Sequence, residues 1–521
     1  MINFMFYFFK KIPRLNYQLI IFVSKIIPPN FLEKISRWRA VSITQFVIKK
    51  VPAYQRFLEE QGTIFKKIKS FDDFKKIPLT DKKNYFLKYK TEDSLIDRSI
   101  LDIYSLEQSG NYDYKTGSIY WPRFPKEERK SLTNLEFLFR YLLGSHQKRT
   151  LVIVAFPLGM WASGEKLCGL IKQIAKKRAA KMTVATPGIN KETIVELIKK
   201  VGQFYERIIL FGNLYFLRRV VELGEKEGID WHKYDIYLLT GAEGFPENLR
   251  EFVRKKIAHE KDFLNPLVPL RIISLFGMTE TSGAIAVETP IAILTRRLAW
   301  QDSNFKKLLF GKNEALPLIF QYNPIETYLE IVNEELVITK LTEQPLLRYN
   351  SHDMAEIFTF KRMIDVLKKT GHDVEKLLKF EGYSKNSILP LPFLFIFGRS
   401  KNIIKIEGIT FTVDDLKEYL SRPELIESNT GNFKMDKIEN EDKSERLCLT
   451  IELLGGIKLS QELIKKYQDV FFNSVPQIKF FLKQYSDPPE QMEPRIQLIE
   501  RGRGPFSLKE EPKYRHLKKQ D

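Results

Sequence analysis

The residues best suited to chemistry form a short polar cluster that follows an apolar run near the middle of the chain. The run Leu270–Phe276 ends at Gly277, and the sequence then reads MTETS over residues 278–282. Thr279 offers a hydrogen-bond donor, and Glu280 offers a carboxylate that could ligate a metal ion. A glycine before them would let a ligand approach the backbone. The cluster predicts a binding site at the end of a buried strand, and an ordinary turn is the alternative.

Three further apolar runs end in glycine-containing turns, as expected for buried parallel strands. They are Leu151–Phe156 before Pro157–Gly159, Arg207–Phe211 before Gly212–Asn213, and Tyr234–Thr240 before Gly241–Glu243. Segments with helical periodicity lie between them, at Lys191–Phe204, Leu214–Glu227 and Pro246–His259. This alternation predicts an α/β fold with a parallel sheet flanked by helices, whose turns meet at one edge.

Other parts of the chain have different patterns. Periodic segments at Phe31–Val51 and Phe71–Leu87 predict helices, with Thr80 placed to cap one that begins near Asp81. Residues 320–360 alternate apolar and polar side chains, which favours an antiparallel or barrel-like subregion. A basic amphipathic helix is expected over 361–380. In the last part we expect a helix at Val413–Leu420 and a strand at Leu447–Leu453.

A chain of 521 residues is too long for one compact core, so more than one domain is expected. We place the boundary near Gly398–Lys401. The prediction is a large N-terminal domain over 1–397 and a small α+β domain over 398–521. Within the large domain, residues 1–100 form a helical lead-in and residues 361–395 form an insertion.

The charge of the chain is uneven. The formal net charge is +19, and residues 1–50 carry nine Lys or Arg against the single Glu33, which makes +8. Their apolar runs, Ile2–Phe9 and Leu19–Ile27, are too short to span a bilayer. A basic helix resting on anionic lipid is one interpretation, and a helix packed on its own domain is the other. No nucleic-acid module accompanies the charge. With only Cys168 and Cys448, the expected location is cytoplasmic, with peripheral contact to the inner membrane face as an option.

Several segments, in this order, resemble the adenylate-forming (AMP-binding) superfamily, and within it the phenylacetate–CoA ligase-like and capsule-biosynthesis branch. They are VPAYQRFLEEQG with FDDFKKIPLTDK, FPLGMWASGE, TGAEGFPENLRE, LFGMTETSG, LRYNSHD and FGRSKNIIKIEGITF. The resemblance covers most of the chain. It implies an ATP-dependent ligase that joins a small carboxylic acid to CoA, with a carrier protein or a sugar amine as alternative acceptors.

The resemblance also implies roles for single residues. Gly241, Ala242 and Glu243 would line the adenine side of the nucleotide, with Phe276 or Gly277 closing the other face. Thr279 would contact the α-phosphate, and Glu280 would hold Mg²⁺. Asp353 would bind both ribose hydroxyls, and Arg399 would add a ribose contact beside a hinge at Ser400–Lys401. Gly408 would lie near the acceptor channel.

In this family the small domain rotates between an adenylation step and a transfer step, and it carries a catalytic lysine for the first. Lys513 matches that lysine best, and Lys509 is the competitor. Seven Lys or Arg occur in the last 21 residues, so a solvated basic tail is the alternative.

The phosphate loop departs from the family pattern. Residues 107–123 keep small or basic residues that suit phosphate binding: Ser109, Gly110, Lys115, Thr116 and Gly117. However, Tyr112, Asp113 and Tyr114 add bulk and a negative charge that repels a triphosphate. The sequence therefore leaves two functions open, an enzyme that forms an acyl-adenylate and a non-catalytic protein that binds an adenylate or a partner. Apolar residues at Met160–Trp161, Phe211–Leu214 and Ala242–Phe245 predict an aryl or medium-sized apolar acid.

Overall fold

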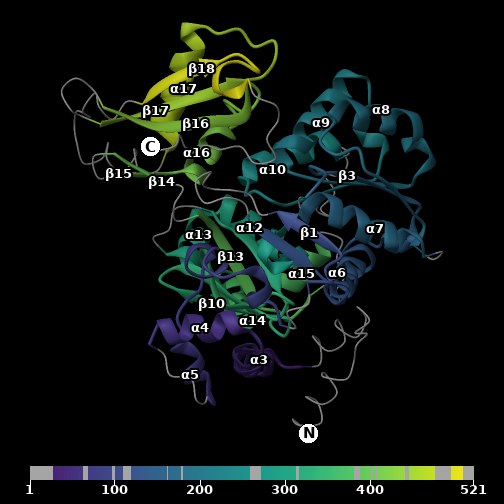
Figure 1. The fold of residues 1–521 in the computed structure, drawn as a ribbon. Coiled ribbons are helices and arrows are strands. Elements are labelled where there is room, and N and C mark those ends of the chain that lie inside the picture. The colour runs from purple at the N-terminus through teal and green to yellow at the C-terminus, as the bar shows by residue number, and fades with distance from the viewer. Residues whose placement is uncertain are drawn as a thin grey trace.

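The computed structural model describes residues 27–62, 68–96, 100–108, 119–160, 162–177, 180–258, 271–311, 316–380, 388–399, 403–406, 409–439, 445–475 and 494–507. Its centre is one mixed sheet of eleven strands (Figure 1). The strands are β3 (Thr150–Ala155), β4 (Met182–Ala185), β5 (Arg207–Gly212), β6 (Ile236–Thr240), β7 (Ile272–Met278), β8 (Gly283–Val287), β9 (Leu318–Tyr322), β10 (Thr327–Val332), β11 (Glu335–Lys340), β12 (Leu346–Phe358) and β13 (Phe393–Arg399). Their order is β10-β11-β12-β13-β9-β8-β7-β6-β5-β3-β4.

The half formed by β4, β3, β5, β6 and β7 is parallel, which confirms the predicted α/β fold. Its central strands β3, β5 and β6 are buried along their whole length because both faces are covered. In β3, Leu151 and Ile153 face one hydrophobic core, and Val152 and Val154 face another. The helices of this half are α6 (Pro125–Phe137), α7 (Leu167–Ala175), α8 (Lys191–Val201), α9 (Leu214–Lys226) and α10 (Glu247–Ile257).

Strand β7 joins the two halves of the sheet. Its first residues pair parallel with β6, with Thr240 opposite Ser274. Its last residues pair antiparallel with β8, with Met278 opposite Gly283. A Cβ at Gly277 would lie 2.4 Å from the carbonyl oxygen of Gly283, so only glycine fits there. The glycine expected to admit a ligand is thus required by the neighbouring strand.

The half formed by β8 to β13 is antiparallel, as expected for residues 320–360. It is continuous with the parallel half through β7 and is covered by α12 (Pro290–Gln301) and α13 (Ser303–Phe310). The helix predicted over 361–380 is instead two helices, α14 (Phe360–Lys369) and α15 (Val374–Phe380). Gly371, with φ 78°, separates them, because a left-handed residue ends a helix.

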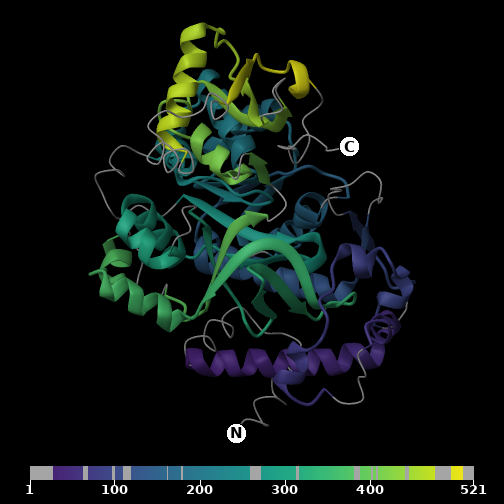
Figure 2. The same cartoon turned by 90° about the vertical axis from the view of Figure 1, so that its left-hand side faces the viewer.

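The N-terminal helices lie along the edge of the large domain that is farthest from the C-terminal elements (Figure 2). They are α3 (Pro29–Lys50), α4 (Pro52–Glu60), α5 (Phe71–Lys75) and the short turn η1 (Lys82–Phe86). The cap predicted at Thr80 is wrong. Asp81 caps η1 by accepting the Asn84 N–H, and Thr80 Oγ1 donates to the carbonyl of Leu347. No helix in the described part of the chain is long and apolar enough to cross a membrane.

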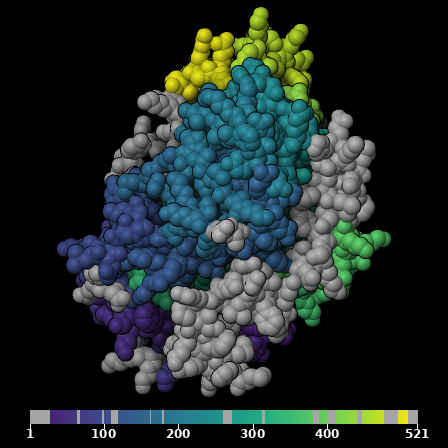
Figure 3. Space-filling view, turned by 90° about the vertical axis from the view of Figure 1, so that its right-hand side faces the viewer, coloured from purple at the N-terminus to yellow at the C-terminus, as the bar shows by residue number. Residues whose placement is uncertain are grey.

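The elements after Arg399 form their own hydrophobic core, and they lie at the opposite end of the molecule from α3 (Figures 2 and 3). They are β14 (Ile403–Ile406), β15 (Ile409–Thr412), α16 (Val413–Leu420), β16 (Asn429–Glu439), β17 (Glu445–Leu453), α17 (Gln461–Ser474) and β18 (Arg495–Ile499). A last pair of strands, β1 (Ser105–Gln108) and β2 (Tyr120–Arg123), forms an antiparallel hairpin in the large domain. The exact domain boundary stays a prediction.

Candidate active site

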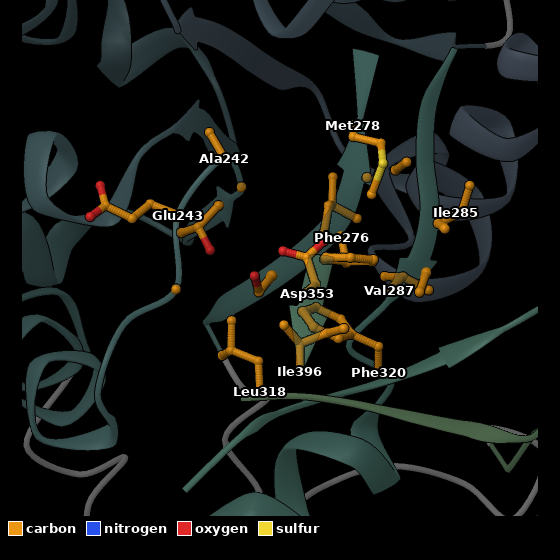
Figure 4. Close-up of a pocket in the computed structure, with 18 of the residues that line it drawn as sticks. Ala242, Glu243, Phe276, Met278, Ile285, Val287, Leu318, Phe320, Asp353 and Ile396 are labelled. Carbon is orange, nitrogen blue, oxygen red and sulfur yellow. The ribbon is translucent and has the colours of Figure 1, made fainter. Parts of the chain in front are cut away.

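A cleft of about 990 Å³ opens where the carboxyl ends of β6 and β7 face α16. The residues predicted to bind the nucleotide or the metal ion all line it where they lie in the described part of the chain: Gly241, Ala242, Glu243, Phe276, Gly277, Thr279, Glu280, Asp353 and Arg399. They come from four different segments, and Figure 4 shows Glu243, Phe276 and Asp353 around one space. The convergence follows from the sheet, because parallel strands end at the same edge.

The turn Gly241–Glu243 forms one wall of the cleft. Ala242 has φ 71°, a left-handed conformation that is costly for a residue with a Cβ. The Glu243 carboxylate accepts a hydrogen bond from Asn213 Nδ2 at 3.0 Å and pairs with Lys417 Nζ at 2.7 Å. Lys417 belongs to α16, so a residue of the C-terminal part holds the turn expected to face adenine.

On the opposite side, the Phe276 ring packs against the Phe320 ring, with centroids 5.6 Å apart. Asp353 on β12 lies directly opposite Arg399 on β13 in the strand register. The Arg399 Nε is 3.3 Å from the Asp353 carboxylate, which is buried. The two residues predicted to contact ribose therefore form an ion pair at the rim of the cleft.

Three buried cations hold the backbone of the turn that carries Thr279 and Glu280. Arg123 donates to the Thr279 carbonyl, and Lys340 Nζ donates to the Thr281 carbonyl at 2.9 Å. Lys166 Nζ donates to both the carbonyl and the hydroxyl of Ser282, at 2.9 and 2.8 Å. Lys166 and Lys340 line the cleft together with Thr279 and Glu280, so the cations that fix this turn belong to the site itself.

Two of these cations share one carboxylate in the β1–β2 hairpin. Glu107 lies 2.7 Å from Arg123 and 3.3 Å from Lys166. Burial lowers the pKa of Lys166 to about 8; the nearby Arg123 adds to this shift and Glu107 opposes it. The cluster ties the stem of the predicted phosphate loop to the 279–282 turn.

Glu280 has a lysine partner that the sequence did not predict. Lys82 Nζ lies 2.5 Å from Glu280 Oε1, and the Tyr349 hydroxyl donates to the same carboxylate at 3.3 Å. Burial alone would raise the pKa of Glu280, but the charge and hydrogen bond of Lys82 hold it below its usual value. Lys82 is the last residue of FDDFKKIPLTDK, one of the segments on which the family resemblance was based. Nothing in that segment indicates a contact with Glu280, almost two hundred positions later in the chain.

The residues that the structure describes do not by themselves form a metal site. Across the described ranges, no group of three or more His, Cys, Asp or Glu side chains could hold a metal ion. Glu280 is the carboxylate predicted to bind Mg²⁺, and the Lys82 ammonium already contacts it. A divalent ion held by protein alone normally has several oxygen ligands.

Other predicted residues lie outside the described part of the chain. They are Ser109, Gly110, Lys115, Thr116, Gly117, Ser400, Lys401, Gly408, Lys509 and Lys513. Of the expected acyl-pocket residues, Phe211 and Ala242–Phe245 line the cleft. Met160, which is 41% exposed, and Gly212–Leu214 are not among the lining residues, and Trp161 lies outside the described part of the chain. Met160 lies instead on the surface after β3.

No protein-family model and no curated protein sequence matches this chain. Among solved structures, it is similar to 2-hydroxyisobutyryl-CoA ligase in the postadenylation state with R3-HIB-AMP, with TM-score 0.60 and 14% identity over 94% of this chain and 89% of that one. It is also similar to the acyl acid amido synthetase AtGH3.15 in complex with 2,4-DB, with TM-score 0.53 and 10% identity over 94% and 90%. The chain has the adenylate-forming ligase fold. The expected resemblance is thus confirmed at the level of the fold.

Proposed function

We propose that this protein activates a small carboxylic acid with ATP and transfers the acyl group to an acceptor. The observation that supports this most is the convergence of Gly241–Glu243, Phe276, Thr279–Glu280 and Asp353 on one cleft. In the first step, a carboxylate oxygen attacks the α-phosphorus and pyrophosphate leaves. In the second, the acceptor attacks the acyl carbon and AMP leaves. CoA is the default acceptor, and a carrier protein or a sugar amine are the other two.

In this proposal each described residue has one role. The Gly241–Glu243 turn and Phe276 hold adenine, and Asp353 with Arg399 binds ribose. Thr279 donates to the α-phosphate, where negative charge develops. Lys82 supplies positive charge beside Thr279 and Glu280, and Lys513 of the small domain serves the adenylation step. Mg²⁺ could bind Glu280 only if Lys82 left the carboxylate. An assay without Mg²⁺ tests whether the reaction needs the ion.

The test is carboxylate-dependent exchange of labelled pyrophosphate into ATP, measured over a broad panel of acids. We expect exchange with at least one acid, because adenylation is reversible while the adenylate stays bound. Complete absence of exchange, together with measurable AMP binding by calorimetry, would establish the second candidate function, a non-catalytic adenylate-binding protein. The bulky and acidic residues Tyr112, Asp113 and Tyr114 in the phosphate loop are the observation that favours this second candidate.

We also propose that the outer face of α3 contacts anionic membrane. The inner face of α3 packs on β10 and β11, while Trp38 and Phe46 remain 45% and 39% exposed. Lys34, Arg37 and Lys49 are exposed on the same helix. Exposed aromatic and basic side chains on one helix are typical of interfacial binding. Figure 2 places α3 at the end of the molecule away from the C-terminal elements.

Vesicle flotation of the full chain tests this contact. We expect the wild type to float with phosphatidylserine vesicles at low salt and to remain unbound with neutral phosphatidylcholine vesicles. The variant W38S/F46S should lose at least about half of the bound fraction, because each exposed aromatic ring contributes about 1–2 kcal/mol of apolar burial. Equal flotation with both lipids, or no flotation at low salt, would contradict the proposal.

A further inference from the structure

Helix α6 lines the cleft with a face that changes from polar to apolar along its length. Glu127, Lys130, Ser131 and Asn134 line the cleft from the helix itself, followed by Leu135 and by Leu138, which comes directly after the helix. These positions recur every three or four residues, so they share one side of the helix. Leu135 and Leu138 share a hydrophobic cluster with Phe211, one of the residues expected to line the acyl pocket. This side of the cleft is therefore partly polar, whereas the sequence predicted an apolar pocket.

Glu127 carries an acceptor that the protein does not use. The side chain is buried, with 6% exposure. Its Oε1 accepts a hydrogen bond from the Glu343 N–H at 2.9 Å, whereas its Oε2 has no hydrogen-bond partner in the described part of the chain. Leaving a buried acceptor unpaired costs about 1–3 kcal/mol, and more for a charged group. A ligand with a hydrogen-bond donor would remove that cost.

A second carboxylate lies in the same wall. Glu326 accepts from Asn134 Nδ2 at 3.2 Å, and its carboxylate is 3.6 Å from Lys340 Nζ. Burial lowers the pKa of Lys340, and the negative charges of Glu326 and Glu127 oppose this shift. Both carboxylates therefore lie near the Lys340 ammonium. Lys340 also donates to Thr281, so the polar cluster adjoins the turn that carries Thr279 and Glu280.

We propose that the acid substrate carries a hydroxyl or amino group that donates a hydrogen bond to Glu127 Oε2. This inference rests on the proposed function and names the substrate class. An unsubstituted apolar acid would leave the buried oxygen unpaired. A second, ionised carboxylate on the acid has no proton to donate, so it would also leave Glu127 Oε2 unpaired. A hydroxyl or amino group satisfies the free oxygen and adds no negative charge.

Pyrophosphate exchange with matched acids tests the proposal. The sets are butyrate with 3-hydroxybutyrate and 4-aminobutyrate, and benzoate with its hydroxy and amino derivatives, with glutarate as the dicarboxylate. We expect at least one donor-bearing acid to exceed its unsubstituted parent at least about tenfold in kcat/KM, because sites built to hydrogen-bond a group reject analogues that lack it. Preference for every parent acid, or for glutarate, would overturn the proposal.

The variant Glu127→Gln tests whether the Glu127 carboxylate causes the preference for donor-bearing acids. Glutamine keeps an oxygen for the Glu343 N–H but replaces the free acceptor with an NH₂ group, so the ratio between the donor-bearing acid and its parent should fall at least about fivefold. Glu128→Gln is the matched control, because Glu128 lies next along α6 and accepts from Gln173 instead. It should keep the wild-type ratio. An equal fall for all acids in Glu127→Gln would contradict the proposal.

Failure of this inference can be told apart from failure of the proposed function. If no acid supports exchange, the proposed function is wrong. Calorimetric titration of the same acids in the presence of AMP then tests the preference for donor-bearing acids without requiring any reaction. Donor-bearing acids should bind at least about tenfold more tightly than their parents. Equal affinities would overturn it.

Discussion

Replacing Glu280 with Gln should reduce carboxylate-dependent pyrophosphate exchange by about 10²–10³-fold, the range for loss of one preorganised electrostatic contact. Glutamine has the same size and can still accept from Tyr349, but it lacks the charge that holds the Lys82 ammonium 2.5 Å away. It also cannot serve as an anionic metal ligand. Both roles proposed for Glu280 require that charge. The measurement is exchange at saturating ATP with the best acid found.

The fold should be unaffected, because Glu280→Gln removes a buried charge and leaves Lys82, which is 30% exposed, able to reach water. Thermal unfolding followed by circular dichroism checks this. Glu196→Gln on α8 is a matched control, since that carboxylate is 63% exposed and pairs only with Lys200 among the described residues. Full activity in Glu280→Gln would show that the carboxylate has no part in adenylation.

Replacing Lys82 with Met should lower the free energy of unfolding by about 2–3 kcal/mol, below the 3–5 kcal/mol seen for fully buried pairs because Lys82 is partly exposed. The variant leaves the buried Glu280 carboxylate without its cation. The double variant Lys82→Met with Glu280→Gln should recover most of the loss, since no buried charge is left. Urea unfolding of the four proteins measures the coupling. Additive effects would contradict a direct interaction.

The same pair predicts a pH dependence. Lys82 holds the pKa of Glu280 below its usual value, so the pair stabilises the fold above about pH 4.5, and this contribution is lost as pH falls through the folded-state pKa. In Lys82→Met the burial of Glu280 would instead raise its pKa. The mutational loss of stability should therefore be large at pH 7 and should shrink as the pH falls below about 4.5 and through the folded-state pKa of Glu280. A loss that is independent of pH would contradict the ion pair.

The sequence predicted the parallel half of the sheet well, because each strand is a continuous apolar run ending in a turn. It missed β4, a strand of four residues of which none is fully buried, so no apolar run marks it. It placed one helix over 361–380, because the amphipathic pattern continues across Gly371 although the backbone does not. The periodicity of apolar residues predicts which side chains are buried, but it does not predict where the backbone ends a helix.

The site was predicted in part for the same reason. Thr279, Glu280 and Gly241–Glu243 follow strands, and their convergence is a property of parallel sheets. Lys82, Lys166 and Lys417 were missed as site residues. Each contacts a residue far away in the sequence, and the residues next to each lysine do not indicate which partner it has. Such contacts arise only when the whole chain has folded.

The β1–β2 hairpin separates the residues that anchor it from the loop that joins its strands, so the two can be substituted independently. Glu107 and Arg123, one on each strand, are anchored to the core at Lys166 and Thr279. Residues 109–118 therefore connect two fixed points, whatever their own sequence. Substitutions between those points leave the anchoring residues Glu107 and Arg123 unchanged. The composition of residues 109–118 therefore does not bear on the contacts that Glu107 and Arg123 make with Lys166 and Thr279.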